Sequence, residues 1–122
     1  MGSTGAVKSS GLPRRLYMED IKVSRDTIRS DVLDLYTRER FTFKSGSEIR
    51  QVHAFAGKGC LKPFEKAAKY AQRYPSGGSA SEWQHCSGIA QITDGKETFT
   101  AEVHWVQGKD KLIREAFIKE YR

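Results

Sequence analysis

Three extended segments of similar length, separated by short connectors that contain glycine, dominate the last third of the chain. They cover residues 84–93, 97–107 and 111–121, and the connectors are Asp94-Gly95-Lys96 and Gly108-Lys109-Asp110. Short connectors with glycine are typical of hairpins between antiparallel neighbours. We therefore predict an antiparallel meander of three strands.

The middle segment of this meander predicts how its two faces differ. Side chains alternate across a strand, so every second residue points the same way. One set is apolar and the other is mostly polar: Phe99, Ala101, Val103 and Trp105 against Thr98, Thr100, Glu102 and His104. We expect the apolar face to pack on the rest of the domain and the polar face to contact water.

Upstream of the meander, the pattern of apolar residues predicts two helices and a hairpin. Ile28, Val32 and Leu35 fall on one stripe of a helix over residues 24–38. A second helix is expected over residues 61–74, where Phe64, Ala67, Ala68 and Ala71 point inward. Residues 41–44 and 48–55 alternate around the turn Ser45-Gly46-Ser47, which predicts a hairpin.

These elements together predict an α+β fold, with N-terminal helices packed on a small antiparallel β-sheet and a C-terminal three-strand meander. The length of 122 residues fits one domain. We assign residues 13–122 to this domain and residues 1–12, which are rich in Gly, Ser and Thr, to a flexible leader or linker.

The net charge of the chain narrows the classes of partner that we expect it to bind. There are 21 Lys and Arg residues against 15 Asp and Glu residues, a net charge of +6. Such an excess on a small domain favours nucleic acid, an anionic membrane face or an acidic protein. No apolar run approaches the ~20 residues that cross a bilayer, so we expect no membrane partner. We place RNA first.

The polar face of the central strand holds the residues best suited to chemistry. His104 lies there beside Thr100, His85 lies on the preceding strand, and Lys119 and Tyr121 lie on the following one. A histidine transfers protons near neutral pH, and a lysine stabilises charge that develops on a phosphate. This combination predicts cleavage of RNA through the 2′-hydroxyl without a metal. The alternative is that His104 is a half-exposed strand residue paired with a neighbour such as Glu102.

Other candidates are weaker. Lys58, in the loop Gly57-Lys58-Gly59, can meet a phosphate, although a plain turn is the simpler interpretation. His53 is more often structural than catalytic in such a place. Cys60 and Cys86 match no metal-ligand spacing, so we expect two reduced and partly buried thiols, no metal and no cofactor.

Several motifs resemble the C-terminal toxin or nuclease domains of bacterial polymorphic toxins and phage minor head proteins. They are Leu12-Pro13-Arg14, Phe43-Lys44-Ser45-Gly46-Ser47, Phe55-Ala56-Gly57-Lys58-Gly59, Trp83-Gln84-His85-Cys86-Ser87-Gly88-Ile89-Ala90 and Ala101-Glu102-Val103-His104-Trp105. The similarity spans about residues 12–119. Such domains are assigned to the barnase, EndoU, colicin and RelE-like superfamily of metal-independent ribonucleases.

The resemblance implies helices packed on a small sheet, with the active site on the open sheet face. It also implies RNA, often transfer RNA, as substrate and an immunity protein as partner. By position, His104, Lys58 and Lys119 match polar or basic positions of the motifs, whereas His85 lies where related domains vary.

The predicted function is therefore a metal-independent endoribonuclease toxin domain. His104 serves as general base or acid, Lys58 and Lys119 bind and stabilise the phosphate, and Thr100 or Tyr121 orients it. We expect an acidic immunity or inhibitor protein to cover this site. The expected place of action is the bacterial cytoplasm, with delivery as the C-terminal part of a secreted effector or phage head protein.

Two alternatives stay open on the sequence alone. The first is a non-catalytic RNA-binding or phage head-assembly module, which binds RNA and leaves its length unchanged. The second is a deoxyribonuclease, which normally needs a divalent metal and an acidic cluster. The sequence has no such cluster near its histidines.

Overall fold

The computed structural model describes residues 11–122 and is built mainly from β-strands. Strands hold 45% of the residues and helices 12%, so the class is mostly β. In chain order the elements are β2 (Leu16–Tyr17), β3 (Ile21–Lys22), β4 (Val32–Leu33), β5 (Arg40–Phe43), β6 (Glu48–Gly57), α1 (Ala67–Arg73), the 3-10 turns η1 (Pro75–Gly77) and η2 (Ala80–Glu82), β7 (Gln84–Thr93), β8 (Thr98–Gln107) and β9 (Arg114–Tyr121).

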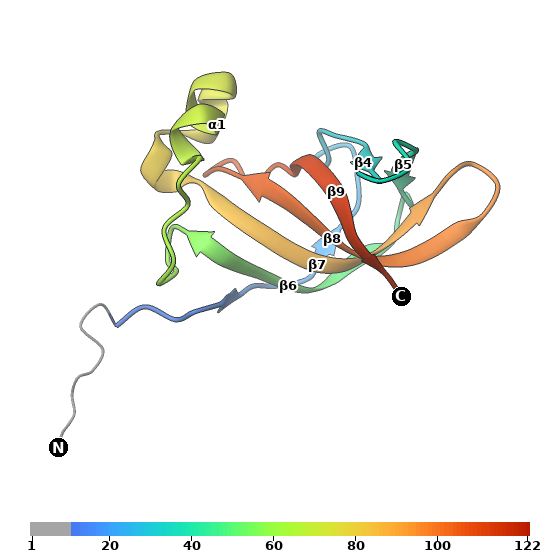
Figure 1. Cartoon of the computed structure of the whole chain (residues 1–122), viewed down its shortest axis with the longest axis horizontal. Helices are drawn as coiled ribbons and strands as arrows, with labels where there is room; N and C mark the ends of the chain where they lie inside the picture. The colour runs from blue at the N-terminus through green and yellow to red at the C-terminus, as the bar shows by residue number, and fades with distance from the viewer. Residues whose placement is uncertain (1–10) are drawn as a thin grey trace, which may run out of the picture.

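Five of these strands close into a small barrel (Figure 1). β7, β8 and β9 form the predicted antiparallel meander, which is confirmed with nearly the predicted bounds. β4 then pairs parallel to β9 and antiparallel to β5, and β5 closes the ring by pairing Phe43 with Ile92 of β7. β6 uses the other part of the same β7 edge and carries β2 and β3 outside the ring.

The inside of the barrel is the hydrophobic core, and the predicted faces of β8 are confirmed. Ala101, Val103 and Trp105 are fully buried, while Thr98 and Thr100 are exposed. The indole nitrogen of Trp105 donates a hydrogen bond to Gln107 Oε1 at 3.0 Å, so its one polar atom is satisfied. A core of this kind stabilises the fold by removing apolar surface from water.

The predicted α+β class, with N-terminal helices on a sheet, is wrong, and the helix over residues 24–38 is the main reason. That segment forms turns and the short strand β4. Ile28 bridges Ile113 in parallel, and Val32 pairs with Ala116 of β9. Two apolar residues four positions apart fit one face of a helix. Here, however, both pair with the β9 region, which lies about 85 residues later in the sequence. Such long-range pairing overrides local preference.

The predicted hairpin over residues 41–44 and 48–55 is also wrong, although both strands exist. β5 pairs with β4 and β7, whereas β6 pairs with β2, β3 and β7. The connecting turn is tied to other parts of the chain: the Lys44 amide donates to Gln91 O, and the Gly46 amide donates to Val23 O. The turn therefore connects two strands that both pair with β7, and it does not pair β5 with β6.

The helix predicted over residues 61–74 is present in part, as α1 (Figure 1). Its first residues are held in a loop, because the Leu61 amide donates to Pro13 O and Lys62 O accepts from Gly57. Trp83, which is fully buried, packs beneath α1 together with Ala67.

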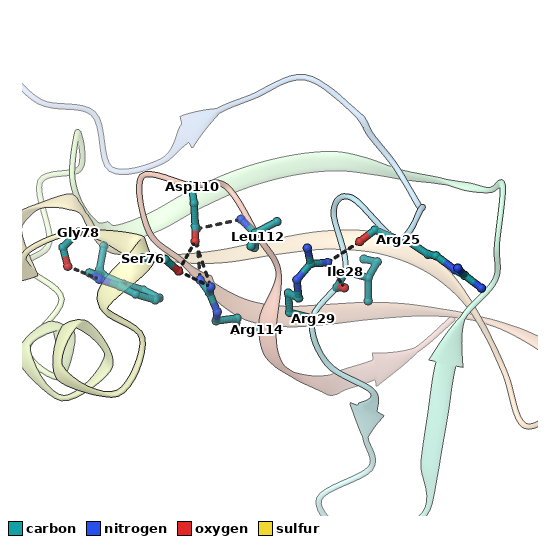
Figure 2. A network of polar contacts seen from close by, with 9 residues as sticks. Arg25, Ile28, Arg29, Ser76, Gly78, Asp110, Leu112 and Arg114 are labelled. Carbon is teal, nitrogen blue, oxygen red and sulfur yellow. Dashed lines mark hydrogen bonds and ion pairs between the residues drawn. The ribbon is translucent and has the colours of Figure 1, made fainter.

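A polar network fixes the turn after α1 to the start of β9. Figure 2 shows the guanidinium of Arg114 between Asp110 and Ser76, with hydrogen bonds of 3.0–3.2 Å to both side chains. Arg114 is buried and lies 4.8 Å from the ring centroid of Tyr74. A buried charge needs such partners. The network therefore holds the α1 region against the barrel.

Residues 1–10, most of the predicted leader, lie outside the described part of the chain. Within residues 11–122 no helix is long and apolar enough to cross a membrane.

Candidate active site

Five residues from five adjacent strands stand in one row across the outer face of the sheet. Tyr17 of β2 lies opposite His53 of β6, and His53 lies opposite Ser87 of β7. Ser87 lies opposite His104 of β8, which in turn lies opposite Phe117 of β9. Opposite residues on neighbouring strands bring their side chains within contact distance. The sheet therefore gathers residues that are up to about a hundred positions apart in the sequence.

Two β-bulges set the direction of this row. The register of β6 shifts between Arg50 and His53. The register of β9 shifts between Arg114, which pairs with Val106, and Phe117, which pairs with His104. Gln51 in the first bulge and Glu115 in the second have positive φ of 53°. A bulge bends its strand and redirects the side chains that follow. Both bulges immediately precede members of the row, and the sequence analysis missed them.

His104 is held by a carboxylate on its own strand. Its Nε2 lies 3.2 Å from Glu102 Oε2, which also accepts a hydrogen bond from Ser87 at 3.1 Å. Arg122 donates to the other oxygen of Glu102 at 3.2 Å. An ionised carboxylate only accepts, so Nε2 carries the proton of a neutral ring and Nδ1 has the lone pair. Glu102 thus orients His104 and stabilises its protonated form.

His85 lies beside His104 in a half-buried aromatic setting. The centroids of the two imidazole rings are 5.7 Å apart, at nearly a right angle. The ring centroids of Phe55 and Phe64 lie 4.4 Å and 5.5 Å from that of His85. Burial, together with the charges of His104 and Lys62, lowers the pKa of His85 to about 4. His85 is therefore neutral at pH 7.

The pKa of His104 is also lowered, and burial is the main cause. The hydrogen bond and charge of Glu102 oppose this shift, while Lys119 and His53 add to it. Burial alone raises the pKa of Glu102, but its bonds from His104 and Ser87 bring it below the ordinary value. The two histidines thus share one site and differ in their tendency to hold a proton.

Of the predicted site residues, the structure brings His85 and His104 together, with ring centroids 5.7 Å apart. Lys119 lies on the neighbouring strand β9, and its charge contributes to the lowered pKa of His104. Thr100 lies further along the same face and is exposed.

Tyr121 faces the end of the barrel instead of the histidines. Its hydroxyl donates to Asp34 Oδ2 at 2.7 Å, and its ring contacts Phe41 and Phe99. The bulges in β9 explain this reversal, because they break the alternation that places Tyr121 and Lys119 on one face.

Lys58 lies in the turn after β6 and is paired elsewhere. Its Nζ donates to Glu82 at 2.7 Å, and its carbonyl accepts from Gln84. In this arrangement its ammonium group faces the η2 turn. The role of Lys58 in binding the RNA phosphate stays a prediction.

Glu102 and Phe55 are the site residues that the sequence analysis left unassigned. Glu102 was visible by alternation, because it precedes His104 by two residues on one strand. Phe55 gave no such signal, since its place beside His85 depends on the pairing of β6 with β7.

The part of the chain that the structure describes has no cluster of side chains suited to a metal ion. Among residues 11–122 there is no cluster of three or more His, Cys, Asp or Glu with the arrangement of metal ligands. Cys60 and Cys86 are both buried and unbonded. Burial raises the pKa of both thiols, which makes them poor nucleophiles.

A groove of about 910 Å³ opens next to His85. Its floor is the outer face of the sheet, with Phe55, His85 and Phe117. One wall is the α1 region and the other is the segment around β4, and Figure 1 shows these two parts standing apart with β9 between them. A volume of this size is in the range of pockets for small organic ligands.

Comparisons with protein-family models, curated proteins and solved structures found no match for this chain. The toxin and nuclease resemblance of the motifs stays a prediction.

Proposed function

We propose that this chain is a metal-independent endoribonuclease domain that cleaves RNA through the 2′-hydroxyl. The observation that carries the proposal is the pairing of His104, held by Glu102, with the neutral His85 at 5.7 Å on one open sheet face. A general base and a general acid within reach of one phosphate are the parts this reaction needs.

The difference between the two histidines suggests their roles. His85 is the base: it takes the proton of the 2′-hydroxyl, and the 2′-oxygen then attacks the phosphorus. His104 is the acid: its imidazolium form, stabilised by Glu102, gives a proton to the 5′-oxygen as the P–O5′ bond breaks. The products are a 2′,3′-cyclic phosphate and a free 5′-hydroxyl. Because both pKa values lie below 6.5, the reaction is favoured in mildly acidic solution.

Lys119 is our candidate for stabilising the phosphate. Its charge acts on His104, and it is exposed on β9. A cation at this place offsets the negative charge that builds up on the phosphate oxygens in the transition state.

The same proposal includes the partner and the place of action. A ribonuclease toxin with a net charge of +6 is most simply inhibited by an acidic immunity protein that covers the histidine group. We place the action in the bacterial cytoplasm, with the domain delivered as the C-terminal part of a secreted effector or phage head protein.

The second candidate is a module that binds RNA without cutting it. It is favoured by the partial burial of the two histidines and by the aromatic residues around them, which suit stacking on bases. In that case RNA shifts on a gel and keeps its length.

His104→Ala tests the proposal. We expect the variant to lower the rate of RNA cleavage by about a hundredfold or more, the usual loss when general acid–base help is removed. Thr98→Ala, an exposed residue on the same strand, is the matched control and should cut as the wild type does. Circular dichroism checks that both variants fold. Full activity in a folded His104→Ala protein would contradict the proposal.

A further inference from the structure

Aromatic side chains that the proposed cleavage step does not use extend along the groove beside His85. Phe64, in the loop before α1, has its ring centroid 5.5 Å from that of His85 and 5.6 Å from that of Tyr70, with interplanar angles of 29° and 30°. Tyr70 continues to the buried Trp83 at 6.0 Å. A series of rings thus leads from the histidines along the α1 wall.

These rings are partly open to the groove. Phe64, Tyr70 and Tyr74 are half-buried and line it. Aromatic rings at a groove surface offer faces or edges to a planar ligand, and stacking of a nucleic-acid base contributes about 1–3 kcal/mol.

The rim of the groove is basic. Lys62 and Lys66 line it, and within residues 11–122 no carboxylate lies at ion-pair distance from either. The charge of Lys62 reaches His85, whose pKa it helps to lower. Two of the lining carboxylates are already neutralised: Asp31 pairs with Arg40 at 3.9 Å, and Glu115 pairs with Arg73. The third, Glu65, has no such partner among residues 11–122, and it leaves the lysines in excess.

We propose that the groove is a subsite for an unpaired RNA base next to the scissile phosphate, and that the substrate is single-stranded or looped RNA. The inference rests on the proposed ribonuclease function. The α1 wall would stack the base, and Lys62 and Lys66 would hold the adjoining phosphates. In a duplex the bases stack on one another inside the helix, so their faces are closed to such rings. The groove therefore selects for RNA whose bases are free.

Binding of a non-cleavable probe tests this directly. The probe is a fluorescent RNA of about ten nucleotides, the scale of a single-strand site, fully 2′-O-methylated so that it lacks the attacking hydroxyl. Fluorescence anisotropy compares the single strand with its duplex. We expect the wild type to bind the single strand at least about fivefold more tightly, because one stacked base contributes about 1–3 kcal/mol. Equal affinity for both forms overturns the inference.

Two variants locate the binding in the groove. Phe64→Leu keeps an apolar side chain but removes stacking, and we expect about tenfold weaker binding of the single strand. The double variant Lys62→Gln/Lys66→Gln removes two phosphate contacts, so the slope of log affinity against log salt should become shallower by about 1.4. Lys96→Gln, on the exposed turn between β7 and β8, is the matched control. If the lysine double variant keeps the wild-type slope and affinity, the inference is wrong, even where Phe64→Leu fails to fold.

Cleavage measured in parallel separates the two proposals. Groove-dependent binding with no cleavage of unmodified RNA contradicts the ribonuclease and leaves the subsite standing. Cleavage that depends on His104, with binding insensitive to Phe64 and the two lysines, contradicts the subsite alone.

Discussion

The two faces of β8 use the same backbone for opposite purposes. The inner face presents Val103 and Trp105 to a closed barrel, where both side chains are fully buried. The outer face presents Glu102 and His104, which are partly exposed and linked by a hydrogen bond. The packed inner face is rigid, and it therefore holds the polar groups of the outer face in fixed positions. Stability and chemistry should therefore respond to different residues of one strand.

Truncation of a buried side chain on the inner face of β8 should give the largest loss of stability. Trp105→Ala removes a fully buried indole and leaves Gln107 Oε1 without that donor, so we expect a loss of about 3–5 kcal/mol in the free energy of unfolding. Urea denaturation measures it. His104→Ala, one residue away, should cost far less stability. If the two variants are equally destabilised, the division between the faces does not hold.

Glu102→Gln sharpens the account of the outer face. The amide oxygen can still accept from His104 Nε2, but the negative charge that raises the pKa of His104 is lost. We expect about tenfold slower cleavage at pH 7, and the decline of kcat with rising pH should begin at lower pH. A uniform loss of rate with an unchanged pH profile would mean that Glu102 has a packing role only.

The aromatic setting of His85 predicts a pH dependence of stability. Its pKa of about 4 in the folded protein lies below the ordinary value of 6.5, so the unfolded chain takes up the proton first as pH falls. The stability from neutral His85 is complete above pH 6.5 and is lost as the pH falls towards 4. For a partly exposed group we expect about 1 kcal/mol. Thermal unfolding of His85→Gln should show a correspondingly smaller drop between pH 6.5 and 4, and equal drops would contradict the burial of His85.

How much of the fold could be predicted from the sequence depends on how far apart the paired strands lie along the chain. β7, β8 and β9 pair with their neighbours in the chain, so alternation and the glycine connectors were sufficient. The helix over residues 24–38 failed because Ile28 and Val32 pair with residues of the β9 region. Local patterns carry no record of such partners.

The candidate site was predictable to the same extent. His104 and His85 lie on the meander and were found, and alternation also marked Glu102. Lys119 lies on the strand next to that of His104, and its charge acts on His104, whereas Tyr121 bonds to Asp34 because a bulge in β9 reverses its direction. Bulges depend on long-range register, which is why no local pattern revealed them.

The most direct test of the account is cleavage of RNA that carries one 2′-deoxy nucleotide at the scissile position, in the presence of EDTA. The outer face of β8 is proposed to use the 2′-hydroxyl as nucleophile, with proton transfer by His85 and His104 and no metal. We predict that unmodified RNA is cut to a 2′,3′-cyclic phosphate and a 5′-hydroxyl, and that the deoxy substitution stops cutting at that position. Cleavage of the substituted RNA at the same bond, or a requirement for a divalent ion, would contradict the mechanism.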